Sequence, residues 1–332
     1  MTTKNVLHTG ASKCYDEQGR ETNCRATGQD AAVQAGIPWP DHRFEAIGDE
    51  LVRDRLTGLF WTRNSGLTEF PLDWQDSLAF IRSMNTERRL GRDDWRLPNR
   101  REMRSLVDHS TSRPALPQPN PFLDINLGWY WTSTTAARNS NYAWYVHFEG
   151  GRMFYGRKTE FYWLWPVAGK SNVVPRTGET SCGKEAGLLT GRDGGIRSGV
   201  TWPEPRFITW TDKVFDRLTN LTWYLGMDSQ NPHSWSEALA EVRSLAEKTG
   251  ESWRMPNINE LESLVDASRH DPALPADYPL QSQLDGYWSS TTSGYAPDWA
   301  YVLYLDRGAV GVGFKRNNNF YLWPVTTEKI QQ

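Results

Sequence analysis

Two nine-residue stretches, "DWRLPNRRE" (Asp94–Glu102) and "SWRMPNINE" (Ser252–Glu260), are nearly the same, and "LVD" comes soon after both. In each stretch an Asn and a Glu stand three residues apart, directly after a proline. An Asn side chain can cap the first turn of a helix, and a Glu three residues on can reach back to the cap amide. Apolar residues then follow at helical spacing. We therefore expect each stretch to start a short amphipathic helix, with its Trp (Trp95, Trp253) packed under that helix, and we favour this over a catalytic Glu.

The repetition extends over most of the chain, because further matching motifs occur in the same order. The matched pairs are "WPDHRF" with "WPEPRF", "VRDRLTGLFW" with "VFDRLTNLTW", "RPALP" with "DPALP", "YWTSTT" with "YWSSTT", and "LWPV" in both copies. A polar segment that contains Gly and Pro lies near residue 170, between the copies. We interpret the chain as a duplicated domain. The first repeat with its N-terminal lead-in is residues 1–169, and the second repeat is residues 170–332.

Composition excludes several classes of protein. The 332 residues carry a formal net charge of -3. This overall charge does not favour binding of a polyanion, so we expect no nucleic-acid partner. Apolar residues reach 38% and aromatic residues 13%, with 17 Trp, which suits a folded protein. No apolar run is long enough for a membrane span. The cysteines have no nearby histidines, so we expect no metal site, and no motif for a cofactor is present.

The cysteines and the N-terminus leave the cellular location open. Cys14 and Cys24 flank a short polar loop that could close as a disulfide, whereas Cys182 has no obvious partner. A disulfide would argue for an exported protein. The first residues lack the apolar core of a signal peptide, so either the protein is cytoplasmic or a leader has been replaced by the starting Met. We expect export to the periplasm or the extracellular space.

Each repeat predicts the same order of elements: a short strand, two helices, a long Pro-rich loop and several strands. In the first helix Trp74 and Trp235 begin the apolar face, and the residues before them form N-terminal capping pairs. The terminal strands are expected to turn near Gly150–Gly151 and near Arg307–Gly308. We therefore predict an α+β fold in which two helices of each repeat pack on a twisted antiparallel sheet.

This order, together with "DRLTGLFW", "WRLPNRREMRSLVD", "YWTSTT", "AWYVHF" and "LWPV", resembles the C-type lectin-like fold. The motifs are most similar to the family of the C-terminal domain of the Legionella collagen-like adhesin. The resemblance covers roughly residues 39–167 and 202–325. It implies two tandem C-type lectin-like domains and, at most, binding of a glycan or a host surface, because the named member binds sulfated polysaccharides. The related formylglycine-generating enzymes need reactive cysteines within the sheet domain. Here all three cysteines lie in the lead-ins, so we do not expect that activity.

The resemblance leads us to predict a non-enzymatic recognition or adhesion protein that binds either carbohydrate, with sulfated or anionic glycans among the candidate ligands, or a surface partner. The alternative is a structural or assembly module that contacts proteins and binds no sugar. An oligomer is possible.

The first candidate site is set by charge. Residues 1–169 carry 21 Lys and Arg against 20 Asp and Glu, whereas residues 170–332 carry 16 against 20. Three arginines at the start of the second helix of repeat 1 have no arginine at the matching positions of repeat 2, and they could face solvent together. Guanidinium groups pair well with sulfate or carboxylate. The opposing interpretation is a solvated face balanced by nearby acidic residues. The three are Arg100, Arg101 and Arg104.

The second candidate site is the loop and strand after each "STT" motif, where C-type lectin-like domains usually present ligands. Aromatic and amide side chains there suit sugar stacking and hydroxyl hydrogen bonds. The opposing interpretation is that the aromatic residues pack in the sheet or between the two repeats. The candidates are Arg138, Asn141, Tyr142, Trp144, Tyr295, Trp299 and Asn317.

Overall fold

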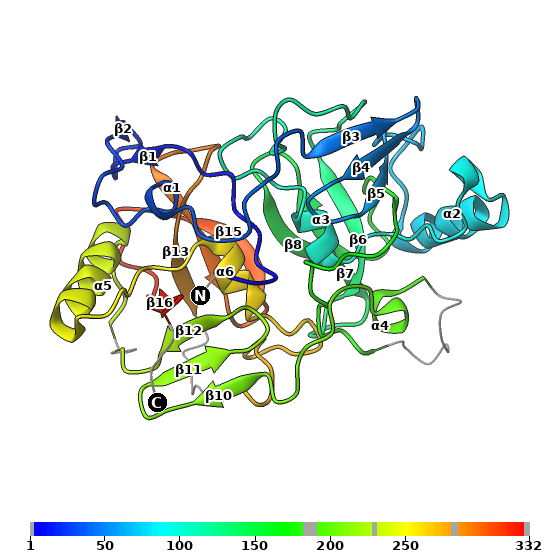
Figure 1. The fold of residues 1–332 in the computed structure, drawn as a ribbon. Helices are drawn as coiled ribbons and strands as arrows, with labels where there is room; N and C mark the ends of the chain where they lie inside the picture. Colours follow the sequence, from blue (N-terminus) through cyan, green and yellow to red (C-terminus); the bar gives the residue numbers. More distant parts are fainter. Residues whose placement is uncertain (1–2, 182–190, 228–230, 280–284, 329–332) are drawn as a thin grey trace.

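The computed structural model describes residues 3–181, 191–227, 231–279 and 285–328. Helices and antiparallel strands are both present, so the chain has an α+β fold (Figure 1). Repeat 1 contains β1 (Cys14–Tyr15), β2 (Glu21–Thr22), α1 (Asp30–Val33), β3 (Phe44–Ile47), β4 (Leu51–Asp54), β5 (Phe60–Thr62), α2 (Trp74–Thr86), the 3-10 helix η1 (Arg89–Gly91), α3 (Arg100–Arg104), β6 (Trp129–Thr135), β7 (Tyr142–His147), β8 (Arg152–Arg157) and β9 (Val167–Ala168). Repeat 2 contains α4 (Asp193–Ile196), β10 (Phe207–Thr209), β11 (Lys213–Asp216), β12 (Leu221–Tyr224), α5 (Trp235–Thr249), α6 (Ile258–Ser263), β13 (Gly286–Thr292), β14 (Trp299–Tyr304), β15 (Ala309–Phe314) and β16 (Val325–Thr326).

The predicted helix starts are confirmed. Asn99 and Asn257 each cap their helix with a complete capping box, in which a Glu side chain returns to the cap amide. α2 begins after Asp73, whose side chain accepts a hydrogen bond from the amide of Asp76. α5 begins with a capping box at Ser234. These local signals act within one turn of chain, so they work equally in both repeats.

The expected position of the repeated Trp is wrong. Trp95 and Trp253 are buried, but they pack with the residues of α2 and α5 rather than under α3 and α6. The Trp95 indole donates a hydrogen bond to the carbonyl of Arg89, just after α2. The apolar residue of α3, Met103, packs in the main core instead, while Trp95 and Leu97 pack with the residues of α2.

A six-stranded antiparallel sheet joins the two repeats, in the order β13-β14-β15-β8-β7-β6. Each repeat supplies three strands, and Val310 of β15 pairs with Met153 of β8 where the halves meet. Figure 1 shows this sheet between α5 on one side and α2 on the other. Both predicted hairpin turns are present, and Gly150, Gly151 and Gly308 adopt positive φ angles there. The strands therefore form one continuous sheet across the duplication.

Smaller sheets bring the beginning and the end of each repeat together. Their orders are β3-β4-β5-β9 in repeat 1 and β10-β11-β12-β16 in repeat 2. The largest group of buried apolar residues takes members from both repeats, such as Trp165 and Trp323, while two smaller groups lie under α2 and α5. The main core is thus shared between the repeats. The division at residue 169 stays an interpretation of the sequence.

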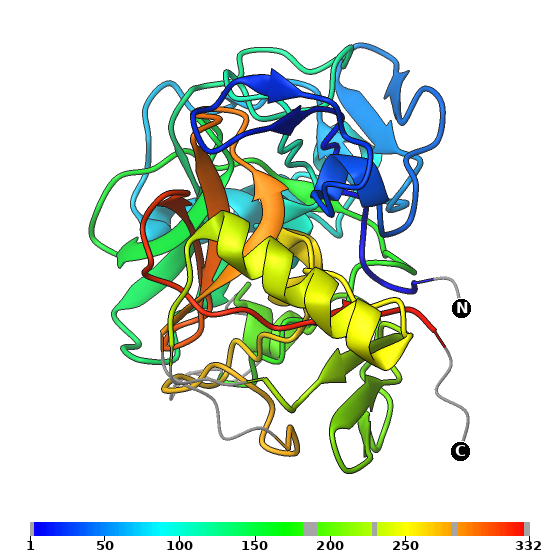
Figure 2. The ribbon, with the colours of Figure 1, turned by 90° about the vertical axis from the view of Figure 1, so that its left-hand side faces the viewer.

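The lead-ins are exchanged between the repeats. We call residues 3–40 the first lead-in and residues 171–203 the second lead-in. In the first, α1 contacts β13 of repeat 2, and in the second, α4 contacts β6 of repeat 1. Figure 2 shows the blue first lead-in beside α5 and the strands of repeat 2. Each lead-in therefore completes the other repeat.

Two buried aspartates hold this exchange in place. Asp30 of the first lead-in accepts a hydrogen bond from Thr291 Oγ1 at 2.7 Å, and Asp193 of the second accepts one from Thr134 Oγ1 at 2.8 Å. Both threonines belong to the "STT" motifs, and each also accepts the first amide of α3 or α6. The repeated "STT" motif is thus an anchor for the opposite lead-in.

Among the helices in the part of the chain that the structure describes, none is both long and apolar enough to cross a membrane.

Candidate functional site

The arginines of α3 do not face solvent. Arg100, Arg101 and Arg104 are only 1%, 5% and 4% exposed. The expectation that they form an exposed patch for anionic glycans is therefore wrong. The physical reason is the position of α3, which packs against repeat 2 at the junction of the two repeats.

Backbone carbonyls of repeat 2 accept hydrogen bonds from two of these arginines. Arg101 Nη2 donates to the carbonyls of Ser263 at 3.0 Å and Val265 at 2.8 Å, at the end of α6. The last carbonyls of a helix lack partners within the helix, and cations are favoured there. Arg100 Nη2 donates to the carbonyl of Gly308, in the β14–β15 turn. The arginines thus connect helix to helix and helix to hairpin across the junction.

Arg104 reaches both repeats from the same helix. It donates to the carbonyl of Gly151 at 3.2 Å and to Asn259 Oδ1 at 3.1 Å. Glu262 occupies the position in repeat 2 that matches Arg104 in repeat 1. Its carboxylate lies 3.4 Å from Arg100 Nη2 and 3.8 Å from Arg101 Nε. The opposite charges of Arg104 and Glu262 at matching positions are a sequence signal that agrees with α3 and α6 facing each other.

Trp144 packs inside the protein, as the opposing interpretation of the second candidate site expected. It is 2% exposed, and the Arg100 guanidinium lies 4.0 Å from its ring centroid. Burial lowers the pKa of Arg100 to about 10, so this side chain stays charged at neutral pH. Tyr301 takes the position that matches Trp144 in repeat 2, and its hydroxyl donates to the carbonyl of Gly150 at 2.6 Å. The aromatic residue at this position serves the junction in both repeats.

Two further candidates lie at the rim of the same junction. Arg138 of repeat 1 is 3.9 Å from Asp306 of repeat 2. Tyr295 of repeat 2 accepts a hydrogen bond from Arg113 Nη2 at 3.0 Å, and that guanidinium also lies 5.2 Å from the Tyr295 ring. Both candidates are exposed, yet both contact the opposite repeat. The loops after the "STT" motifs therefore serve the junction as well.

The remaining candidates do not form one site. Asn141 is exposed, and the Tyr142 hydroxyl accepts a hydrogen bond from Arg157 at 3.1 Å. In repeat 2, Trp299 is 36% exposed, with its ring 5.6 Å from Phe314, and Asn317 lies in the exposed turn that follows. The two groups belong to different repeats, in opposite halves of the central sheet.

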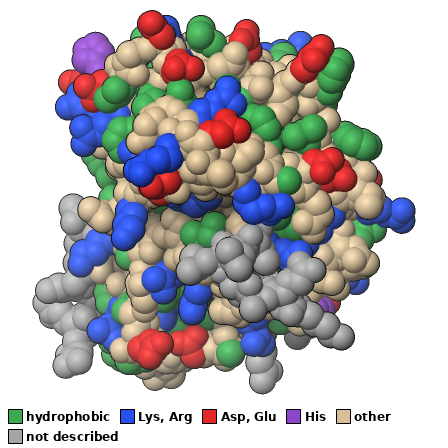
Figure 3. Space-filling model, turned by 90° about the vertical axis from the view of Figure 1, so that its right-hand side faces the viewer, with side chains coloured by type: hydrophobic (Ala, Val, Ile, Leu, Met, Phe, Trp, Pro, Cys, Tyr) green, Lys and Arg blue, Asp and Glu red, His purple; other side chains and the backbone are tan. Residues whose placement is uncertain are grey.

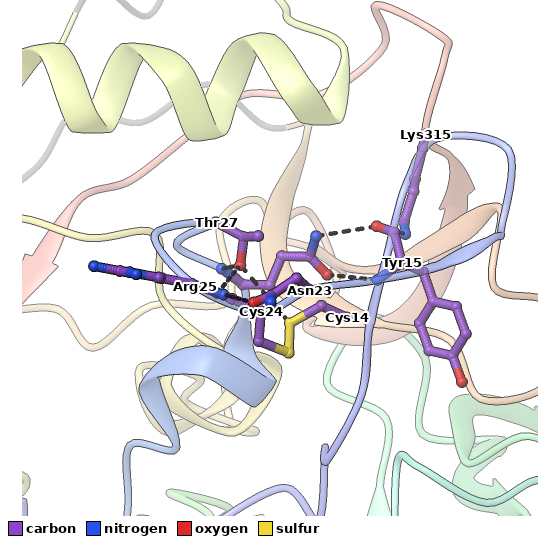
Figure 4. The surroundings of a disulfide bond; sticks show 8 residues. Cys14, Tyr15, Asn23, Cys24, Arg25, Thr27 and Lys315 are labelled. Carbon is purple, nitrogen blue, oxygen red and sulfur yellow. Dashed lines mark hydrogen bonds between the residues drawn. A yellow bond between two sulfur atoms is a disulfide. The ribbon is translucent and has the colours of Figure 1, made fainter.

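A disulfide closes the hairpin of the first lead-in. Cys14 and Cys24 are bonded, so the disulfide alternative is confirmed, while Cys182 lies outside the described residues. Figure 4 shows Lys315 of repeat 2 beside the backbone of Tyr15, whose carbonyl is 3.4 Å from Lys315 Nζ. The Lys315 side chain also lies 4.1 Å from the Trp235 ring, and burial lowers its pKa to about 7. This hairpin therefore helps to attach the first lead-in to repeat 2.

A cationic cleft lies where the second lead-in meets repeat 1, and the sequence patterns did not single it out. Its volume is about 760 Å³, within the range of ligand sites. Lys170, Arg176 and Arg197 line it, and in the described part of the chain none of them forms an ion pair. Figure 3 shows Lys and Arg side chains spread over the face nearest to α2 and α4. The cleft is thus a candidate site for an anion.

The acidic residues of the cleft already have partners. Asp93 lies 3.1 Å from Arg88, and Asp94 lies 2.9 Å from Arg92 and also accepts the amide of Gly169. The Arg92 hydrogen bond contributes to holding the pKa of Asp94 below its usual value. These carboxylates therefore do not pair with Lys170, Arg176 or Arg197, the three cations that have no ion pair among the described residues.

The matching cleft of repeat 2 has a different charge. It is lined by Arg254 and Thr327 of repeat 2 and by residues of the first lead-in, including Gln34. Sequence alignment of the repeats places Glu328 opposite Lys170, His8 opposite Arg176, and Gln34 opposite Arg197. Three separate substitutions thus make one cleft cationic and leave the other without this charge. Each cation stands alone in the sequence, so only a residue-by-residue comparison of the repeats could have found the group.

In the described residues, no group of His, Cys, Asp and Glu side chains has the arrangement of a metal site. No curated protein shows a significant match to the chain. A family described as the Lcl C-terminal domain matches residues 50–168 and 212–326, which together make up more than half of the chain. The two matches coincide with the bodies of the two repeats, after their lead-ins. The chain therefore belongs to the Lcl C-terminal domain family and carries two copies of that domain.

Proposed function

We propose that the protein is a non-enzymatic recognition module that binds an anionic glycan in the cationic cleft of repeat 1. The observation that carries the proposal is the group formed by Lys170, Arg176 and Arg197 around a cleft of about 760 Å³, three cations that form no ion pair with any described residue. Sulfate and carboxylate groups on a sugar chain are natural partners for such cations. The resemblance to a collagen-like adhesin that binds sulfated polysaccharides supports the same ligand class, and so does the expected C-type lectin-like fold.

The proposed place of action is outside the cytoplasm, in the periplasm or the extracellular space. The Cys14–Cys24 disulfide supports this, because disulfides persist in oxidising compartments. The association of the family with a surface adhesin supports it as well.

The repeats themselves provide the test. The triple variant Lys170→Glu, Arg176→His and Arg197→Gln gives the cleft of repeat 1 the residues of repeat 2. We expect binding to immobilised heparin and dextran sulfate to weaken by about tenfold or more, equivalent to roughly 1.4 kcal/mol. A matched control, Arg53→Ala, Lys248→Glu and Arg316→Ala, changes the net charge by the same amount at exposed positions outside the cleft. The control should bind almost as well as the unmodified protein.

Two outcomes would contradict the proposal. If both triple variants lose affinity equally, the binding depends on net charge and not on the cleft. If the unmodified protein binds no sulfated polysaccharide, the alternative function as a structural or assembly module becomes the better proposal.

A further inference from the structure

A second, much smaller cavity lies at the junction of the repeats. It has a volume of about 50 Å³ and lies between α3, α6 and the two lead-ins. Its polar lining includes Arg101, Arg104, Asn259 and Glu262, and apolar residues of both lead-ins complete it. Such a volume holds a single ion or very few water molecules and is too small for a sugar.

The cavity lies in a region with more positive than negative charge nearby. Within the described residues, Glu262 is the only carboxylate that lies within 4 Å of Arg100, Arg101 or Arg104. Asp193 and Asp266 act on Arg100 and Arg101 only from farther away. Two of the three guanidinium groups thus share one close carboxylate, and all three are buried.

Hydrogen bonds do not remove this imbalance. Most partners of the three arginines are neutral backbone carbonyls, which satisfy N–H groups without cancelling charge. Two groups on the cavity lining are buried without a hydrogen-bond partner among the described residues, Arg101 Nη1 and Glu262 Oε1. Arg100 Nε and Nη1, which lie outside the lining, are also buried without one. Buried charge without a counter-charge is unfavourable, so an additional negative group at the cavity would stabilise the junction.

We propose that this cavity binds a small inorganic anion of the halide type, next to Arg101 and Arg104. The anion neutralises the excess positive charge and fastens the two repeats to each other. This site is separate from the glycan cleft, and the inference does not depend on the proposed function.

Crystals grown or soaked in sodium bromide provide the direct test. Bromide scatters anomalously, and we expect an anomalous peak in the cavity within hydrogen-bond distance of the Arg101 or Arg104 guanidinium. The absence of a peak in a crystal that shows bromide elsewhere would overturn the proposal.

Thermal unfolding tests the same site in solution. Melting temperatures are compared in sodium bromide and in sodium gluconate at equal ionic strength. An anion that binds only the folded state raises the melting temperature as its concentration increases. We expect the melting temperature of the unmodified protein to rise with bromide concentration. The exposed control variant Arg53→Ala should show the same rise. Equal melting temperatures in the two salts would overturn the proposal.

The variant Glu262→Gln makes the test directional. It removes the close carboxylate that repels an anion, so bromide affinity should increase by about tenfold or more. Arg101→Asn, which introduces the residue found at the matching position of repeat 2, should lose the bromide response. If Arg101→Asn does not fold, Glu262→Gln still decides, because a weaker bromide response than in the unmodified protein contradicts the proposal.

Discussion

The same capping box starts α3 in repeat 1 and α6 in repeat 2, but the helices continue differently. In repeat 1 arginines follow the box, and in repeat 2 the matching positions hold Ile258, Asn259 and Glu262. The shared residues start a helix in both repeats, and the unshared residues face each other across the junction. Duplication therefore supplied two similar halves, and divergence at a few positions allowed them to pack on one another.

The largest effect is expected when Arg100 of repeat 1 is replaced by isoleucine, the residue at the matching position 258 of repeat 2. Arg100→Ile leaves the carbonyl of Gly308 without its donor and removes the closest cation from Glu262. Removing one partner of a buried ion pair typically costs about 3–5 kcal/mol, and we expect a loss of unfolding free energy in this range. Urea denaturation measures it.

The control for this substitution is Arg53→Ile, at an exposed position of β4, which should change stability by less than about 0.5 kcal/mol. Similar stability of Arg100→Ile and the unmodified protein would show that the junction does not depend on this arginine.

A second experiment compares the two buried aspartates that anchor the exchanged lead-ins. Burial raises the pKa of Asp193 to about 7 and that of Asp30 to about 6, from 3.8. The protonated carboxyl is therefore favoured in the folded state and contributes to the free energy of unfolding. This contribution is fully present at low pH and is lost as the pH rises through the pKa of the folded state. Asn stays neutral at every pH. From pH 5 to pH 8, Asp193→Asn should thus gain more than about 1 kcal/mol of stability relative to the unmodified protein.

Urea denaturation at the two pH values measures this difference. Asp30→Asn should behave in the same way over a lower range of pH, because the pKa of Asp30 is raised less. A stability difference that stays constant between pH 5 and pH 8 would mean that Asp193 does not titrate in this range.

The smallest loss of stability is expected at the helix caps that both repeats share. Asn99→Ala and Asn257→Ala each remove a helix cap, which typically costs about 1 kcal/mol. Each Asn also donates to the opposite lead-in, to the carbonyl of Ser198 or of Ala35. The two variants should therefore lose similar stability in urea denaturation. A several-fold difference would contradict the equivalence of the two helix starts.

Local features of the fold were predictable from the sequence. The capping residues, the turn near Gly150–Gly151 and the apolar face that begins at Trp74 are each set by a few neighbouring residues. The position of Trp95 was not predictable in this way, because it depends on which helix lies nearer in space.

The candidate sites were harder to predict. A charged side chain on a short helix has the same local sequence whether it faces solvent or another repeat, and Arg101 faces the other repeat. The cationic cleft depends on the packing of a lead-in against repeat 1. Lys170 and Arg197 are far apart in the chain, and nothing in the intervening sequence indicates that they meet.

The duplication, the family, the order of elements and the starts of the helices can be read from the sequence alone, because they depend on motifs and on contacts within a turn. The exchange of the lead-ins, the burial of the arginines of α3 and the cationic cleft beside repeat 1 become visible only in the folded structure. Those features arise from contacts between residues far apart in the chain, such as Asp30 with Thr291, which are 261 positions apart. The two nearly equal halves offer no local signal for which half each segment joins.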